Sequence, residues 1–267
     1  MPKGARKAAD ATVTWARIEA APSSERVPLT RDEIVATAIR LIDEGGIEAF
    51  SMRRLGHELD AGATSLYWHV RNKDELEDLI IDDVIGEVLA DYEAVVAPDA
   101  DWRERLAEVA RALRRVLLRH RHIAPLLGER PTIGPQALDA AETVMGILLD
   151  AGFDTRATSL ASGALINYAS GFAIFESRSP GGSGDAPETR ELAKAVASYF
   201  AQLPADRYPH MKAAARVQIT ETEQFEYGLQ RLLDGLSNDL ATLSTAPSVA
   251  TPDADADAGE GNVMLRR

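Results

Sequence analysis

The stretch FSMRRLGHELDAGATSLYWHVRNKDEL, residues 50–76, decides the fold of the first quarter of the chain. Ser51 can cap a short helix with an apolar inner face. A tight connection at residues 60–63 leads into a second short helix, which runs from Thr64 to about Val70. Two short helices joined by such a turn have the shape of a helix-turn-helix.

Helical patterns flank this stretch and continue to about residue 240. Several helices are predicted to open with a capping residue that is followed three places later by Glu, which satisfies orphan backbone amides. These pairs are Thr30/Glu33, Asn72/Glu75, Asp101/Glu104 and Thr220/Glu223. The other predicted helices span residues 31–44, 72–96, 101–119, 123–127, 135–150, 155–176, 188–202 and 220–240. Because no segment alternates like a strand, we expect an all-α fold with an N-terminal helix-turn-helix domain and a C-terminal helical domain.

The run from Ser65 to Lys73 reads SLYWHVRNK and resembles the DNA-binding domain of the tetracycline-repressor (TetR) family of bacterial transcription regulators. A helix of this length fits the major groove, where side chains near its start reach base edges and flanking groups hold phosphates. The resemblance implies DNA contacts from Arg53, Thr64, Ser65, Tyr67, His69 and Lys73. Leu66, Trp68 and Val70 alternate with this set and are predicted to pack in the core.

A weaker resemblance to the tetracycline-responsive branch of the family continues to about residue 178. Where that branch has a magnesium-binding histidine, this chain has Leu126, and where it has an Asn and a Phe against the drug, it has Val109 and Leu113. Leucine cannot ligate a hard cation, so we expect a small, largely apolar effector in place of a magnesium–tetracycline chelate. The predicted pocket comprises Val109, Leu113, Leu126, Arg130, Asn167, Tyr168 and Phe172.

Geometry favours a homodimer, because two reading helices related by a two-fold axis reach half-sites about 34–36 Å apart on a palindromic operator. We expect the dimer surface on the helices at 155–176 and 220–240. Its predicted residues are Ala161, Ala164, Phe225, Leu229, Leu232 and Leu236. The predicted organisation is a flexible arm at 1–28, a DNA-binding domain at 29–75, an effector and dimerisation domain at 76–240, and a disordered acidic tail at 241–267.

Composition and charge narrow the classes of function. The 267 residues include no cysteine, which excludes disulfides, thiolate metal sites and cysteine nucleophiles. The net charge is −13, and residues 74–240 hold −12 of it, whereas residues 30–73 hold −1. The predicted reading helices therefore escape most of the repulsion from phosphate. No stretch has the pattern of a signal peptide or a membrane span, so we expect a cytoplasmic protein with no membrane partner.

The sequence thus predicts a ligand-responsive repressor whose partners are double-stranded operator DNA, a small-molecule effector and a second copy of itself. We expect no enzymatic activity and no cofactor. His120 and His122 are two positions apart, on different faces of a helix, so we expect no metal site. Two alternatives stay open: an activator or constitutive DNA-binding protein of the same fold, and a helical small-molecule carrier that does not bind DNA.

Overall fold

The computed structural model describes residues 29–61, 63–129, 132–178 and 187–245, and these residues form helices, turns and irregular segments without a strand. The all-α prediction is confirmed. An N-terminal unit contains α2 (Arg31–Gly45), the single-turn 3₁₀ helix η1 (Ile47–Ala49), α3 (Met52–Glu58) and α4 (Ala63–His69). The long helix α5 (Lys73–Val95) follows directly.

The remaining helices form the C-terminal part of the molecule. They are α6 (Trp102–Arg119), the 3₁₀ helix η2 (Ala124–Gly128), α7 (Pro135–Asp150), α8 (Thr155–Arg178), α9 (Pro187–Ala201), α10 (Pro209–Ala214) and α11 (Glu221–Thr245). The sequence pattern did not predict η1 or α10. Helix α11 also runs past the predicted end at Leu240, so residues 241–245, assigned to the tail, are helical. The predicted arm at 1–28 and the rest of the tail lie outside the described residues.

The predicted helix caps are confirmed at all four positions. The backbone N–H of Glu33 donates to Thr30 Oγ1 at 3.1 Å, and the N–H of Glu75 donates to Asn72 Oδ1 at 2.7 Å. The N–H of Glu104 donates to Asp101 Oδ1 at 2.9 Å, and that of Glu223 to Thr220 Oγ1 at 3.1 Å. At Thr220 the Glu223 carboxylate also accepts from the Thr220 N–H at 2.8 Å, which completes a reciprocal capping box.

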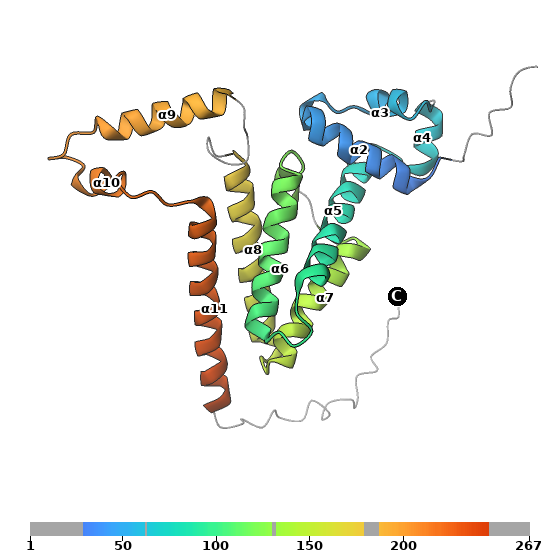
Figure 1. Cartoon of the computed structure of the whole chain (residues 1–267). Coiled ribbons are helices and arrows are strands. Elements are labelled where there is room, and N and C mark those ends of the chain that lie inside the picture. Colours follow the sequence, from blue (N-terminus) through green and yellow to red (C-terminus); the bar gives the residue numbers. More distant parts are fainter. Residues whose placement is uncertain (1–28, 62, 130–131, 179–186, 246–267) are drawn as a thin grey trace, which may run out of the picture.

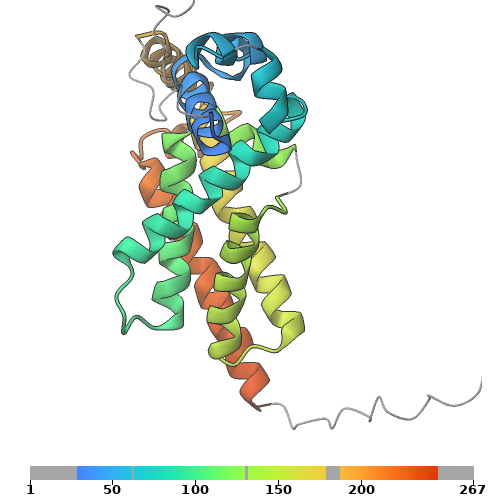
Figure 2. The ribbon, with the colours of Figure 1, turned by 90° about the vertical axis from the view of Figure 1, so that its right-hand side faces the viewer.

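Helix α5 connects the two parts of the molecule. Figure 1 shows it leaving the N-terminal unit and running down beside α6 and α7, and Figure 2 shows the same course from the side. Its Leu76 and Ile80 are fully buried near the N-terminal unit, and Val84 and Val88 continue the buried face toward α6. Because one rigid helix packs in both places, a shift of the C-terminal bundle against α5 also moves the N-terminal unit.

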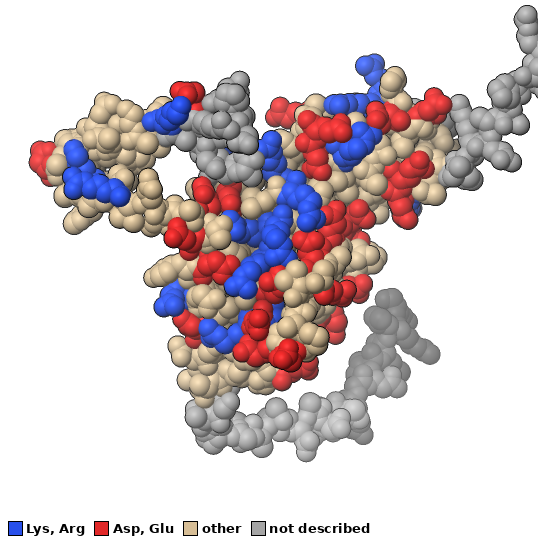
Figure 3. All heavy atoms as spheres, in the orientation of Figure 1, with Lys and Arg blue, Asp and Glu red and all other residues tan. Residues whose placement is uncertain are grey.

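Helix α6 is rich in arginine, and in Figure 3 Lys and Arg side chains gather over it while Asp and Glu side chains lie over α5 beside it. Arg111 forms a bidentate pair with Glu226 of α11, with both N···O distances 2.8 Å. Arg114 pairs likewise with Glu176 of α8 at 2.7 and 2.8 Å. These pairs fix α8 and α11 against α6 through two parallel hydrogen bonds each.

Candidate nucleic-acid interface and effector cavity

The turn between α3 and α4 has the hydrogen bonds of a Schellman motif. The Asp60 N–H donates to the His57 carbonyl at 3.3 Å, and the Ala61 N–H donates to the Gly56 carbonyl at 2.9 Å. Asp60 takes the left-handed position at φ 44°, which Asp tolerates better than most residues. A Cβ at Gly56 would meet the Ala61 carbonyl oxygen at 3.1 Å, so a glycine there lets the turn close tightly. The turn sets the angle of α4.

Helix α4 buries one face and presents the other to solvent. Leu66 and Val70 are 1% and 0% exposed, which confirms that they pack in the core. Trp68 is 84% exposed, so the prediction that it packs with them is wrong. The physical reason is the helical period: Leu66 and Val70 are four apart and share a face, whereas Trp68 lies two positions on, nearly opposite. Helical spacing, in place of simple alternation, would have assigned Trp68 to the outer face.

The predicted DNA contacts lie around this outer face. Ser65 and Tyr67 are exposed, His69 is partly exposed, and the backbone carbonyl of His69 accepts from Arg31 of α2 at 3.2 Å. Thr64 belongs to α4, and its side chain lies outside the described residues. Arg53 is exposed on α3, and Lys73 is exposed at the start of α5, with its Nζ 3.3 Å from Glu77. The outer face thus combines aromatic, hydroxyl and basic groups.

A cavity of about 350 Å³ lies in the C-terminal bundle, between α5, α6, η2, α7 and α8. Its walls are mainly aliphatic, and its polar lining includes Thr132, Asn167 and Ser170. The Ser170 hydroxyl already donates to the Ile166 carbonyl at 2.6 Å. The aliphatic lining residues are Ile85, Val88, Val109, Leu113, Leu127, Val144, Ile166 and Ile174. Such a chamber favours an apolar molecule that is oriented by a few polar groups.

Three of the predicted pocket residues, Val109, Leu113 and Asn167, line this cavity together. Leu126 is buried but does not line it; the next residue of η2, Leu127, does. Adjacent residues of a 3₁₀ helix point in directions about 120° apart, which explains the one-residue difference. Leu126 offers no donor atom to a hard cation, so a chelated magnesium ion has no ligand at this position. Arg130 lies outside the described residues.

The assignment of Tyr168 and Phe172 to the same pocket is wrong. Tyr168 stacks on Phe225 of α11 with ring centroids 5.5 Å apart, and its hydroxyl donates to the Phe225 carbonyl at 2.7 Å. Phe172 contacts the same ring edge-on at 5.3 Å. Burial of its phenol raises the pKa of Tyr168. These aromatic residues face α11 because they lie on a different side of α8 from Asn167.

A shallow groove of about 580 Å³ runs between α8 and α11, and four of the six predicted dimer residues line it: Ala161, Ala164, Leu232 and Leu236. Phe225 and Leu229 are fully buried within the protomer, so their assignment to the dimer surface is wrong. They belong to the face of α11 that packs against α6 and α8. Leu160 is 62% exposed and Phe175 is 75% exposed on α8, and Tyr227 of α11 is 70% exposed. The sequence analysis missed these three exposed side chains.

The helix-turn-helix unit, the connecting helix and the helical bundle with its cavity define a two-part regulator fold. Residues 34–78 match the family described as "Bacterial regulatory proteins, tetR family", and residues 96–240 match "Tetracyclin repressor-like, C-terminal domain". The chain belongs to the TetR family of transcriptional regulators. Among the described residues, no helix is both long enough and apolar enough to span a membrane.

Relatives include an HTH-type transcriptional regulator of Saccharopolyspora erythraea, which is 45% identical over 150 residues. That alignment spans 56% of this chain and 61% of the relative, less than two thirds of its length. The HTH-type transcriptional repressor DrrR1 of Streptomyces coeruleorubidus is 32% identical over 219 residues, or 78% of this chain and 77% of that protein.

Solved structures of similar fold include complexes. ActR from Streptomyces coelicolor in complex with actinorhodin superposes with a TM-score of 0.69 at 32% identity, covering 80% of this chain and 99% of that one. BioQ of Mycobacterium smegmatis with its natural double-stranded DNA operator superposes with a TM-score of 0.54 at 26% identity, covering 79% and 99%.

Proposed function

We propose that the chain is a repressor that binds a palindromic operator as a homodimer and is released by a small, largely apolar effector. The observation that carries this proposal is helix α4, which Leu66 and Val70 anchor while Tyr67 and Trp68 stay exposed. Two large aromatic side chains next to each other on the surface form an apolar patch of the kind that marks an interaction site. The named repressor among the relatives and the operator complex of BioQ support DNA as that partner.

The proposed operator contacts are shared between groups that read bases and groups that hold phosphates. We expect Ser65 and Tyr67, which are exposed, and Thr64 of the same helix to contact base edges in the major groove. Arg53 and Lys73 flank α4 and are suited to the phosphates on either side, and His69 lies near the end of the same helix. The DNA-binding domain is taken as residues 29–75 and the effector and dimerisation domain as residues 76–240.

A second copy is proposed to cover the outer faces of α8 and α11. Leu160, Phe175 and Tyr227 are each more than 60% exposed there, beside the groove lined by Ala161 and Leu232. Exposed apolar side chains on two helices that pack side by side are typical of a subunit interface. A two-fold axis through it brings two reading helices to one face of the operator.

The effector is proposed to bind in the cavity between α5, α6 and α8. An apolar molecule would be enclosed by the aliphatic walls and oriented by Asn167, since Val109 and Leu113 offer no hydrogen bond. ActR, solved with actinorhodin, supports a bound small molecule in this fold. A ligand that binds one conformer of the helical bundle better shifts the population of reading-head arrangements, and typical couplings of about 1–3 kcal/mol change affinity about 5–150-fold.

The proposal is tested on DNA upstream of the gene that encodes this chain. We expect the purified protein to protect two symmetric half-sites in a footprint, and a reporter under that DNA to be expressed more strongly when the chain is deleted. The variant Y67A should lose protection while its circular dichroism spectrum is unchanged. Reporter expression that decreases when the gene for this chain is deleted would indicate an activator. Purified protein that protects no part of this DNA in the footprint would refute DNA binding at this site.

A further inference from the structure

We propose that Asp43, His120 and Glu87 form an interdomain clamp that fixes the N-terminal unit at a set angle on the effector domain, and that filling the cavity acts on the DNA-binding unit through it. This inference rests on the proposed function, because it names the residues through which the effector would reach the operator.

The clamp joins three helices through one imidazole ring. His120 Nδ1 lies 2.7 Å from Asp43 Oδ2 of α2, and His120 Nε2 lies 3.1 Å from Glu87 Oε2 of α5. The ring belongs to the residue that follows α6, and His120 is 6% exposed. Carboxylates only accept, so each contact is a hydrogen bond when the facing ring nitrogen carries a proton. The N-terminal unit, the connecting helix and the bundle thus meet at one side chain.

Asp43 is poorly placed for its own helix. It lies near the C-terminal end of α2, where an acidic side chain opposes the helix dipole, and no basic residue lies in the last turn. Its second oxygen, Oδ1, is buried and has no hydrogen-bond partner among the described residues. The side chain as a whole is 28% exposed, and His120 is the one side chain among the described residues that bonds this carboxylate, so loss of the ring removes that hydrogen bond. Asp43 therefore acts outside α2, on His120.

The backbone of His120 connects the clamp to the cavity. Its N–H closes α6 on the Val116 carbonyl at 2.9 Å, and its own carbonyl accepts from Ile123 and Ala124 at 2.8 and 2.9 Å. Those two bonds close the turn that leads into η2, whose Leu127 lines the cavity, while α6 lines it with Val109 and Leu113. A ligand that separates η2 from α6 therefore moves the residue that holds Asp43.

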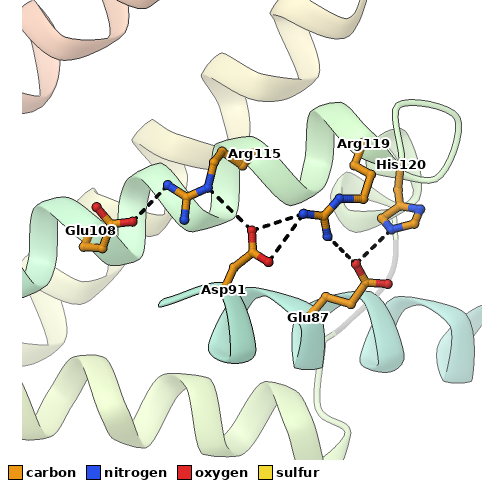
Figure 4. A network of polar contacts seen from close by, with 6 residues as sticks. All are labelled: Glu87, Asp91, Glu108, Arg115, Arg119 and His120. Atoms are coloured by element: carbon orange, nitrogen blue, oxygen red, sulfur yellow. Dashed lines mark hydrogen bonds and ion pairs between the residues drawn. The ribbon is translucent and has the colours of Figure 1, made fainter. Parts of the chain in front are cut away.

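The neighbouring pairs keep α6 and α5 together, so the movable contact is the one to α2. Figure 4 shows Arg119 bridging Glu87 and Asp91, with Arg115 bonded to Asp91 and Glu108. The Arg119 Nη1 to Glu87 Oε2 distance is 2.7 Å, and the Arg119 Nη2 to Asp91 Oδ2 distance is 3.2 Å. None of these arginine contacts reaches α2. The ring of His120 adds that link.

The test measures a distance between the N-terminal unit and α6, which changes when the angle between them changes. It needs neither DNA nor effector. Because the chain has no cysteine, spin labels at H57C on α3 and E104C on α6 report one distance within a protomer. Both sites are exposed, and labelled protein diluted into excess unlabelled protein avoids distances between subunits. The variants are H120F and D43A. The matched controls are E44A, an acid of the same α2 turn that pairs with Arg40, and R115Q, which removes a contact between α6 and Asp91 of α5 and touches no residue of the clamp.

We expect one narrow distance peak in the parent, E44A and R115Q proteins, and loss of that peak in H120F and D43A. The double variant D43A/H120F should broaden no further than H120F, because both changes break one contact. Alanine at position 43 improves the local helix, so D43A decides the matter if H120F does not fold. Unchanged peaks in D43A, or equal broadening in E44A, would overturn the clamp. A failure of operator binding in the footprint would leave this result unaffected.

Discussion

The most exposed large apolar side chain among the described residues of the N-terminal unit is Trp68, and its position separates stability from recognition. Leu66, two positions earlier, is 1% exposed, whereas Trp68 is 84% exposed. A tryptophan on the surface of a free protein contributes little to folding, because its ring stays in contact with water in both the folded and unfolded chain. These two residues of one helix should therefore respond to truncation in opposite ways.

We expect W68A to change the free energy of unfolding by less than about 0.5 kcal/mol, as is usual for surface positions, and to weaken operator binding. L66A should cost about 2–5 kcal/mol, because it opens a cavity in the core. Urea denaturation and DNA titration of both variants check this pair. A strongly destabilised W68A would place the ring in the core after all.

At the scale of elements, the N-terminus of α7 is capped by a carboxylate from another helix. Asp82 of α5 accepts from the backbone N–H of Ala137 at 3.0 Å and of Gln136 at 3.4 Å. Gly134 occupies the N-cap position, and a Cβ there would collide with the Asp82 side chain. The first turn of α7 is thus capped from α5, so the helix that carries Ala137 and Val144 to the cavity is bonded to the connecting helix.

The loss of stability should depend on how much of this cap each variant removes. D82A removes the acceptor and should cost about 1 kcal/mol, the usual loss for an N-cap carboxylate. D82N keeps an acceptor oxygen and should cost less, while G134A should be at least as harmful as D82A because the new methyl group displaces Asp82. Thermal unfolding at fixed protein concentration measures the order. Equal stability of D82A and the parent would show that water replaces the cap at no cost.

Helix boundaries in this chain were predictable, and the partners of helix faces were not. Capping pairs depend on residues within a few positions, and Gly46, with a φ of 79°, ends α2 in the same local way, so local sequence locates these boundaries. Phe225 and Leu229 were assigned to the dimer surface, because an apolar stripe on a helix does not state whether a core or a second subunit covers it. The same ambiguity explains why Tyr168 was assigned to the effector pocket. Its position depends on Gly228 of α11, where a Cβ would collide with the ring, and that contact joins residues distant in sequence.

The Arg111–Glu226 pair between α6 and α11 should make stability depend on pH. Hydrogen bonds from Arg111 lower the pKa of Glu226. A carboxyl whose pKa is lower in the folded state stabilises the fold above its unfolded pKa of about 4.3 and loses this contribution as pH falls through the folded value. Both side chains are about one third exposed, so the contribution is about 1 kcal/mol or less.

We therefore expect R111Q to be less stable than the parent at pH 7 and the difference to shrink below about pH 4. Urea unfolding across this range gives the comparison, with R231Q as the control because its pair with Asp234 is more exposed and lies within α11. A difference that stays constant down to about pH 3 would assign the effect of R111Q to lost packing.

At the scale of the whole molecule, charge separates the acidic bundle from the nearly neutral N-terminal unit that is proposed to bind DNA. Only residues 30–73 must approach phosphate, and they hold −1 of the net charge of −13. One reading helix contacts few bases, so specificity requires two, and the exposed faces of α8 and α11 are where the second copy is proposed to pack. The arm of α9 and α10 projects away from the bundle on the α11 side of Figure 1, toward the space that a partner would occupy.

The last prediction concerns that assembly. A glutamate at Leu160 or Phe175 would place a charge in the proposed interface and open no cavity in the core, since both side chains are mostly exposed. We expect L160E/F175E to sediment as a monomer with unchanged helicity and to lose the two-half-site footprint, because burying unpaired charges costs several kcal/mol. L138E is the matched control: Leu138 is 58% exposed on α7 and does not line the groove, so this variant should remain a dimer. A double variant that still sediments as a dimer would place the subunit interface elsewhere on the molecule.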